Sequence, residues 1–186
     1  MDPALIAAIV AFLVVAFAFL AIYNTLVRLR NLVADSWSGV ETELKRRHDL
    51  IPNLVSAVRG YMKFEQQVLE NVTKLRSQLA SSNSDPKERG YAESELSRGL
   101  KSLFAVVENY PELKANANVM TLQQELVRTE DRIQAARRFY NGNVRDYNTR
   151  CETIPSNIIA SMFGFKKCQF FEIESSTERE VPQTEL

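Results

Sequence analysis

Nineteen consecutive apolar residues, 4–22, constrain this chain more than any other feature. Residues 3–27 contain no charged side chain, and twelve of the nineteen apolar residues are Leu, Ile, Val or Phe. An α-helix over this stretch is roughly 29 Å long at 1.5 Å per residue, which matches the hydrocarbon thickness of a bilayer. Insertion of the large apolar side chains alone is favourable by roughly 4 to 7 kcal/mol. The sequence therefore predicts a transmembrane anchor with ends at Ala4 and Ile22.

The residues on either side of this segment predict its processing and its orientation. A cleaved signal peptide, the main alternative, normally begins with cations and has a shorter apolar stretch. Here only Met1-Asp2-Pro3 precede the segment, whereas Arg28, Arg30 and three cations at 45–47 follow it. The cytoplasmic flanks of membrane spans are enriched in Lys and Arg. We therefore predict an uncleaved single-pass anchor in the inner (cytoplasmic) membrane, with the N-terminus outside and the rest of the chain in the cytoplasm.

Beyond the anchor, apolar residues recur every three or four positions, as they do on one face of a helix. This stripe keeps one heptad phase over 23–81 except at Glu65, and a reversal would require a loop of a few residues. Pro52 interrupts the pattern because it lacks an amide hydrogen and clashes with the carbonyl of residue 48. The sequence predicts one long helix that is kinked at Pro52, with a break into two helices as the alternative.

Prolines and short polar stretches divide the remainder of the chain into further helices. Asp85-Pro86 is a typical helix start, and Pro111 and Pro155 end the helical patterns that precede them. Gly99, inside the first of these patterns, is consistent with close approach of another helix. The expected helices span about 86–110, 118–154 and 156–164, with Gly164 ending the last.

Together these expectations define an all-α fold class. An N-terminal transmembrane helix continues into an elongated antiparallel helical bundle, because short connections make consecutive helices antiparallel. Only six glycines and six prolines are present, which favours long helices over a sheet with many turns. The predicted parts are the anchor (1–22), the bundle (23–173) and a polar tail (174–186) that is expected to be disordered.

A charged cluster with the sequence KRRHD lies just before Pro52. Direct contact of this cluster with lipid is disfavoured, since a straight helix puts Lys45 roughly 35 Å beyond the apolar segment, which is several Debye lengths. We expect an ion-pair cluster with acidic residues of a neighbouring helix or subunit, while Pro52 sets a bend. A partner-binding surface is the alternative. The cluster residues are Lys45, Arg46, Arg47 and Asp49.

Tyr–Asn pairs form a second unusual pattern. The pairs at 140–141 and 147–148 are seven residues apart, so they share one helix face. Buried tyrosines and amides can hydrogen-bond between helices and fix their register. An exposed docking strip is the alternative. The predicted register residues are Tyr23, Asn24, Trp37, Tyr140, Asn141, Tyr147 and Asn148.

Residue types that carry catalysis or bind metals are sparse. His48 is the single histidine, and no glutamate lies three residues before it, as a di-iron bundle motif requires. Cys151 and Cys168 lack CxxC spacing, and the sequence contains no phosphate-binding loop, hydrolase motif or zinc-protease motif. A net charge of zero does not indicate a nucleic-acid binder. We expect a protein that is not an enzyme, with no cofactor, no metal and no nucleic-acid partner.

Several segments, taken in order, carry a resemblance to a known family. They are YNTLVRLRN, WSGVETELKRRHDLIPNLVSAVRGY, LENVTKLR, YPELKANANVMTLQQELVRTEDRIQAARRFYNGNVRDYN and the later GF and FFE. Over about residues 23–172 the chain resembles the LemA family of bacterial membrane proteins. The resemblance implies one N-terminal span, an all-helical bundle and no established enzymatic chemistry. Small departures from the family pattern occur at Glu41-Thr42-Glu43 and at Phe64.

The resemblance also implies what the chain can be expected to do. Relatives are associated with membrane proteases, with envelope stress and, in magnetic bacteria, with the formation of membrane organelles. The leading hypothesis is a non-enzymatic, membrane-anchored scaffold whose helices associate side by side into a homo-oligomer and bind other membrane proteins, proteases among them. The alternative is a membrane-remodelling or membrane-organelle protein in which the short segment 156–164 contacts lipid, together with Phe163, Phe165, Phe170 and Phe171.

Overall fold

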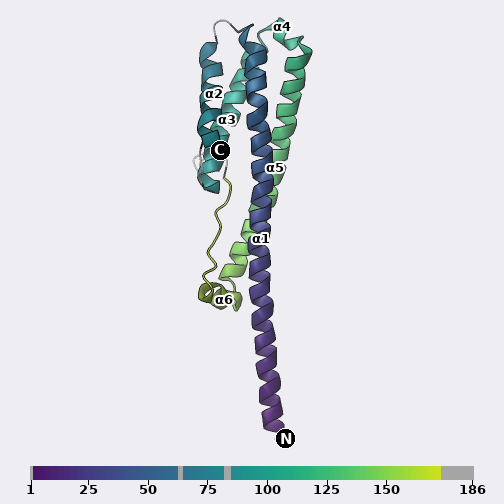
Figure 1. Cartoon of the computed structure of the whole chain (residues 1–186), viewed down its shortest axis with the longest axis vertical. Helices are drawn as coiled ribbons and strands as arrows, with labels where there is room; N and C mark the ends of the chain where they lie inside the picture. The colour runs from purple at the N-terminus through teal and green to yellow at the C-terminus, as the bar shows by residue number, and fades with distance from the viewer. Residues whose placement is uncertain (1, 63–64, 82–84, 173–186) are drawn as a thin grey trace, which may run out of the picture. The chain divides into compact units, whose positions relative to one another are not determined.

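The structure is a computed structural model and describes residues 2–62, 65–81 and 85–172. Within these ranges the regular structure is helical, and no strand occurs. The helices are α1 (Pro3–Arg59), α2 (Gln66–Ser81), α3 (Pro86–Val107), α4 (Pro111–Lys114), α5 (Ala117–Glu152) and α6 (Ser156–Met162) (Figure 1). The predicted all-α fold class with a long apolar N-terminal helix is therefore confirmed. The predicted tail and Phe64 lie outside the described residues.

The chain divides into two compact units, and α1 and α5 contribute residues to both. One unit, called the anchor unit below, combines Met1–Ser38 with Phe139–Cys168. The other, called the bundle unit, combines Gly39–Arg138 with Gln169–Leu186. Each unit has a hydrophobic core of its own.

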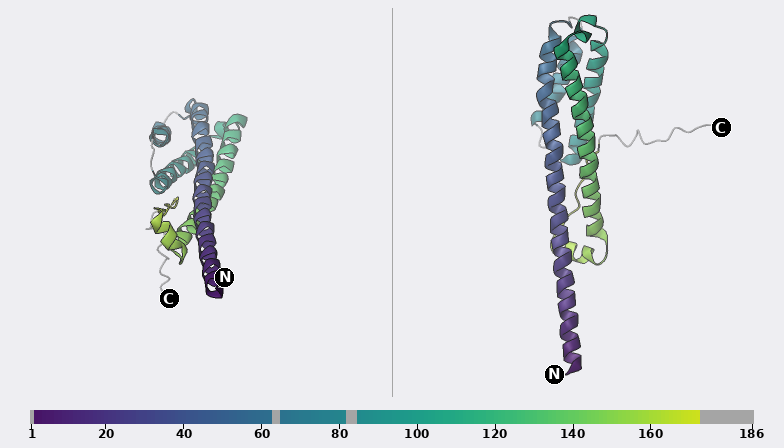
Figure 2. Two further views of the ribbon diagram at one scale, coloured as in Figure 1. Left: turned by 60° about the horizontal axis from the view of Figure 1, so that its bottom comes forward. Right: turned by 90° about the vertical axis from the view of Figure 1, so that its right-hand side faces the viewer.

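In the bundle unit, segments of α1, α2, α3 and α5 run antiparallel to their neighbours along the chain (Figures 1 and 2). Each contributes side chains to one apolar core, because its apolar residues recur at helical spacing on one face. Gly99 of α3 lies at a close crossing with α2, since a Cβ atom there would be 3.4 Å from Val72 Cγ2 and 3.5 Å from Leu75 Cδ1. The core residues include Ile51, Leu54, Val58, Leu69, Val72, Leu96, Leu103, Leu113 and Leu126.

In the anchor unit, a smaller core joins α1 to α6. Leu26 of α1 is fully buried against Ile159 and Ala160 of α6. Half-buried side chains surround these three: Phe19, Ile22, Tyr23, Cys151 and Phe165. This core therefore includes the last residues of the predicted membrane span.

Most helix ends lie where the sequence places them. Asp85 caps α3, and its carboxylate accepts hydrogen bonds from the amides of Lys87 (3.1 Å) and Glu88 (3.0 Å), with Pro86 in the first turn. Gly164 follows α6 with a φ of 69°, a left-handed conformation that glycine adopts without strain. The connection between the helices expected over 86–110 and 118–154 contains one helical turn, α4, because Pro111 is also suited to a first helical position.

The prediction of a single helix over 23–81 is wrong. Helix α1 ends at Arg59, where Gly60 follows, and the amides of Tyr61 and Met62 both donate to the carbonyl of Val58. The unbroken heptad stripe misled the prediction because both arms of the reversal face the same core. Met62, with 1% of its surface exposed, fills that core at the turn. A break into two helices does occur, but it follows Gly60 and not the residues near Pro52.

Helix α1 continues through Pro52, which lies on its exposed side. Proline cannot donate to the carbonyl four residues earlier, so the His48 oxygen loses its usual helical partner. Arg76 of α2 supplies a replacement, because its Nε donates to the His48 oxygen at 3.2 Å. The bend expected at Pro52 stays a prediction. The freed His48 carbonyl, in contrast, binds a side chain of another helix.

Candidate functional site

The first turns of α1 are the surface that most needs a partner. Phe12 is 72% exposed and Phe17 is 75% exposed, and no element of the described chain covers this stretch. Because successive helical residues are about 100° apart, the exposed residues 12–15 already point to every side of the helix. The other large exposed residues here are Leu5, Ile6, Ile9, Val10 and Leu20. Surfaces of this size and composition mark contact with a membrane or another protein.

Among the described residues, α1 is the one helix long and apolar enough to cross a membrane. Ala4, the predicted start of the span, is exposed in the first turn of this helix. Ile22, the predicted end, is half-buried in the core of the anchor unit. The last residues of the predicted span, from Phe19 to Ile22, therefore already have packed neighbours.

An aromatic cluster lies at the predicted end of the span. The ring centroids of Tyr23 and Phe163 are 4.8 Å apart, and those of Phe19 and Phe163 are 5.9 Å apart. Tyr23 also meets Phe165 at 5.8 Å, and the Arg30 guanidinium lies 5.2 Å from the centroid of the Phe165 ring. Edge-to-face aromatic pairs and a cation over a ring are favourable arrangements. The cluster fixes the chain after α6 to α1.

The other predicted register residues lie in or near the anchor unit's packed interior. Trp37 and Tyr140 pack with ring centroids 5.2 Å apart, and Tyr147 is almost fully buried. Asn141 is half-buried, whereas Asn24 is exposed. Burial raises the pKa of Tyr140 to about 12, so its phenol stays protonated at physiological pH. The assignment of these residues to helix register stays a prediction.

Asn148 has a partner that the sequence did not indicate. Its side-chain amide donates to the carbonyl of Cys168 at 2.9 Å, and its side-chain oxygen accepts from the Cys168 amide at 2.9 Å. The asparagine thus binds backbone and not a tyrosine on another helix.

Burial raises the pKa of both Cys151 and Cys168, which makes these thiols less nucleophilic.

Arg47 is the centre of a buried ion-pair network in the bundle unit. Only 1% of its surface is exposed. Its guanidinium binds the carboxylate of Glu93 on α3, and its Nη1 donates to Glu130 Oε2 on α5 and to Ser97 Oγ on α3, both at 2.7 Å. Its Nη2 also donates to the main-chain carbonyl of Glu93 at 3.3 Å. One side chain of α1 therefore joins α3 and α5.

Glu93, equally buried, is surrounded by donors on several sides. His48 Nε2 lies 3.1 Å from its Oε1, and Arg89 Nε lies 3.2 Å from the same atom. Burial acts to raise the pKa of this carboxyl, but the hydrogen bond with His48 and the positive charge of Arg47 outweigh it. The net result is a pKa below the ordinary value of 4.5. Glu93 is therefore ionised at neutral pH and compensates the buried arginine.

The predicted cluster thus separates into buried and exposed residues. Arg47 pairs with acidic residues of neighbouring helices. Arg46 lies on the surface and pairs weakly with Glu43 of its own helix at 3.7 Å, and Lys45 and Asp49 are exposed. The sequence did not single out Glu93 as a partner of the cluster. Its spacing could have indicated burial, because Glu93 lies three residues before the buried Leu96 and so on the same face of the helix.

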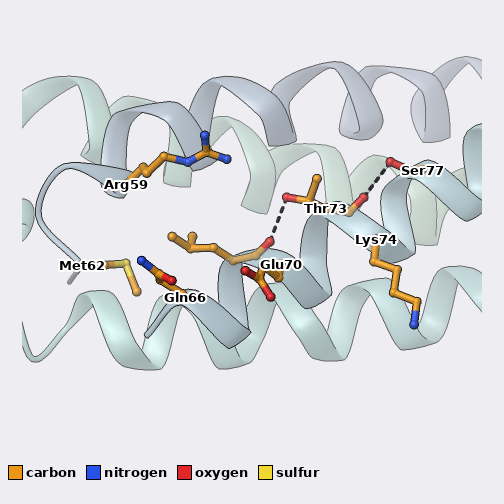
Figure 3. Close-up of a pocket in the computed structure, with 8 residues that line it drawn as sticks. Arg59, Met62, Gln66, Glu70, Thr73, Lys74 and Ser77 are labelled. Atoms are coloured by element: carbon orange, nitrogen blue, oxygen red, sulfur yellow. Dashed lines mark hydrogen bonds between the residues drawn. The ribbon is translucent and has the colours of Figure 1, made fainter. Parts of the chain in front are cut away.

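The bundle unit has two hollows of note. One adjoins this network, and the other lies near the end of α1. A cleft of about 160 Å³ is lined by Arg47 of α1 and by residues of α3 and α5, among them Glu130 and the apolar Leu100 and Phe104. A more open groove of about 530 Å³ lies between the end of α1 and α2 (Figure 3). Its lining includes the exposed residues Arg59, Glu70, Lys74 and Ser77. Across the described residues no group of three or more His, Cys, Asp or Glu is placed to hold a metal ion.

Comparison with known protein families identifies the family of this chain. Residues 36–186 match the family model described as the LemA family. The chain belongs to the LemA family. The match covers the larger part of the chain and includes both the buried network and α6.

Relatives of this LemA-family chain occur in different bacteria. It is 25% identical to Protein LemA of Metamycoplasma hominis over 170 residues, which cover 91% of this chain and 78% of that protein. It is 25% identical to Magnetosome protein MamQ 2 of Paramagnetospirillum magneticum over 175 residues, 81% of this chain. Magnetosome protein MamQ of Magnetospirillum gryphiswaldense is 24% identical over 80% of this chain. The chain spans 64% of the length of each of these two magnetosome proteins.

Proposed function

We propose that this LemA-family chain is a non-enzymatic helical scaffold held in the cytoplasmic membrane through residues 4–22. Its N-terminus lies outside, and the rest of the chain lies in the cytoplasm, where it forms a homo-oligomer and binds other membrane proteins, including proteases. The observation that carries this proposal is the uncovered apolar surface of the first turns of α1. A bilayer is the partner that matches a helix of this length with apolar side chains on every side.

The buried network supports a scaffold over an enzyme. Arg47, His48 and Glu93 are shielded from solvent, and both Arg47 and His48 bind the Glu93 carboxylate, so these buried polar groups join helices. Buried polar networks of this kind specify one arrangement of helices, and a rigid surface follows. The exposed part of the predicted cluster, Lys45, Arg46 and Asp49, is then available to partner proteins.

Proximity labelling from the cytoplasmic end tests the scaffold. The full chain with a C-terminal labelling enzyme is expressed in its native cell, and labelled membrane proteins are compared with those of a Lys45→Ala/Arg46→Ala/Asp49→Ala variant. We expect the variant to lose labelled partners, whereas a matched surface variant, Glu70→Ala/Lys74→Ala/Ser77→Ala, retains them. Arg47 is left unchanged because its loss would disturb the fold. Labelling of extracytoplasmic proteins alone would contradict the proposed orientation. The same labelled partners for the unchanged protein and for both variants would argue against Lys45, Arg46 and Asp49 as a partner-binding surface.

A second function, in shaping a membrane organelle, is favoured by the similarity to magnetosome proteins. Reconstitution of the full chain into vesicles separates the two candidates. A scaffold leaves vesicle shape unchanged in electron cryomicroscopy at all protein densities. A remodelling protein produces tubules or invaginations that increase with protein density, and this result would move the proposal to the second function.

A further inference from the structure

We infer that α6 and the turn before it form an interfacial lipid-binding foot, whose outer face enters the membrane surface beside the end of the span. This foot consists of Ile154, Ile158, Met162 and Phe163. It deepens the proposed function and rests on the membrane anchor proposed there. The ligand class is a lipid surface, and the contact is made by side chains that the anchor unit leaves uncovered.

The foot has an inner face and an outer face. Ile159 and Ala160 of α6 are buried against Leu26 of α1, which fixes the orientation of the short helix. On the opposite side, Ile158 is 59% exposed and Met162 is 65% exposed, and these two are one helical turn apart. Ile154, in the preceding turn, is exposed still further. Ile158 and Met162 thus form an exposed apolar face on α6, and Ile154 adds exposed apolar surface in the turn before it. Water solvates such a surface poorly.

The contacts of α6 with α1 place this surface at the depth of a bilayer interface. Phe163, which follows α6, packs on Phe19 and Tyr23, at the last turn of the apolar span. If the hydrocarbon region ends near Ile22, a side chain in contact with Phe19 lies within the interfacial layer. Amphipathic helices lie in this layer with their apolar faces buried about 5–10 Å deep. Continuity with the span therefore identifies the occupant of the exposed face as lipid.

Cations next to the foot match an anionic membrane surface. Lys166 and Lys167 follow α6 and are exposed, and Lys167 pairs with Glu152. Arg28 and Arg30, about two helical turns beyond Ile22, are also exposed. Each cation near an anionic lipid surface adds about 1 kcal/mol of attraction. Exposed apolar side chains with cations nearby are the pattern of interfacial anchors.

The structure corrects which aromatic residues can take part. Phe171 is fully buried in the bundle unit, and Phe165 packs beneath Arg30 and Tyr23. The lipid contact expected for these two from the sequence is therefore wrong for Phe171 and limited for Phe165. The lipid-facing set consists instead of Ile154, Ile158, Met162 and the outer half of Phe163.

Single-tryptophan variants of the full chain test the foot. Trp37→Phe removes the native tryptophan, and Ile158→Trp or Met162→Trp adds a reporter at an exposed position that tolerates a larger side chain. Phe12→Trp reports from the span. Asp35→Trp reports from an exposed position about 20 Å further along α1 than Ile22. Each variant is reconstituted into phosphatidylcholine–phosphatidylglycerol vesicles, and circular dichroism establishes that the fold is retained.

We expect the tryptophan emission of the Ile158→Trp and Met162→Trp variants to be blue-shifted and to lose intensity in vesicles of lipids brominated along the acyl chain. The loss of emission intensity at the two α6 positions should be smaller than the large loss for Phe12→Trp and larger than that for Asp35→Trp, which should show none. Water-like emission without bromine quenching at both α6 positions, with Phe12→Trp still quenched, would overturn the foot alone. Blue-shifted emission without quenching would mean that protein covers this face and would also overturn it. An unquenched Phe12→Trp would instead contradict the anchor itself.

Discussion

At the residue scale, the bundle unit depends on charges that are buried in pairs. Arg47 could not remain in an apolar interior alone, because burying an isolated charge costs several kcal/mol. Glu93 and Glu130 compensate it, and Ser97 satisfies part of its remaining hydrogen-bonding capacity. The arginine thus fixes which faces of α1, α3 and α5 meet, since a rotation of any one helix would separate the partners.

Arg47→Met is expected to destabilise the protein by about 3–5 kcal/mol, because it leaves the buried Glu93 carboxylate without its strongest cation. The free energy of unfolding is measured by urea denaturation of the full chain in detergent, followed by circular dichroism. Arg46→Met, one residue earlier on the exposed side, is the matched control and should change stability by less than about 0.5 kcal/mol. Equal effects of the two substitutions would contradict the network's importance.

The lowered pKa of Glu93 predicts a dependence of stability on pH. Its folded-state pKa lies below the unfolded value of about 4.5, so the unfolded state binds more protons in acid. The stabilisation is complete above that unfolded value and is lost as pH falls through the folded pKa. Glu93→Gln should therefore flatten the fall in stability below about pH 4.5. Parallel stability profiles for both chains over this window would show that another group is responsible.

The carbonyl freed by Pro52 gives a test of the bond between Arg76 and His48. Arg76→Met should cost about 1–2 kcal/mol, because a partly buried carbonyl loses its donor. In a Pro52→Ala background the new amide of residue 52 can donate to that carbonyl, so the same substitution should cost less. A double-mutant cycle of unfolding free energies measures the difference. Strictly additive costs would mean that the arginine acts through some other contact.

At the element scale, the sequence predicted helix positions better than it predicted the path between them. Capping at Asp85, the helix start at Pro86 and the stop at Gly164 are local signals, and each agrees with the structure. The reversal after Gly60 was not predicted. The apolar residues before and after it keep the same spacing, because the helices on both sides of the reversal face one core. Likewise, local patterns did not reveal Asn148 as a partner of Cys168, twenty residues further along.

Helix α3 has a second close approach, at Gly90, where the chain after α6 crosses it. A Cβ atom at Gly90 would lie 2.0 Å from the carbonyl oxygen of Glu172, whose carboxylate also accepts a hydrogen bond from Tyr91 at 3.0 Å. Gly90→Ala should therefore reduce the free energy of unfolding by about 1–3 kcal/mol through steric displacement of that segment. Chemical denaturation of the full chain provides the measurement.

Gly142 of α5 is the matched control for this prediction. A Cβ atom there would meet nothing within 4 Å, so Gly142→Ala should stabilise the helix by about 0.5–1 kcal/mol. Opposite signs for the two glycine substitutions are the expected pattern. If Gly90→Ala were as favourable as Gly142→Ala, the contact between α3 and residue 172 would not persist in solution.

At the scale of the whole molecule, the sequence indicated an apolar anchor followed by helices, and the structure has a helix, α1, that is long and apolar enough to cross a membrane. The apolar run 4–22 could be recognised because a membrane imposes a length and a composition on consecutive residues. The buried network could not be fully predicted, because ion pairs between residues 46 and 83 positions apart depend on tertiary packing. For the same reason the sequence suggested the segment of α6 as a lipid contact but added Phe171, which is buried.

Intact-mass spectrometry of the alkali-resistant membrane fraction tests the central claim most directly. The chain is expressed in full, membranes are washed with alkaline carbonate, and the protein that stays with the lipid is weighed. We predict that nearly all of the protein resists extraction and that its mass includes residues 4–22. Release into the wash, or a mature protein that begins after Ile22, would contradict an anchored scaffold.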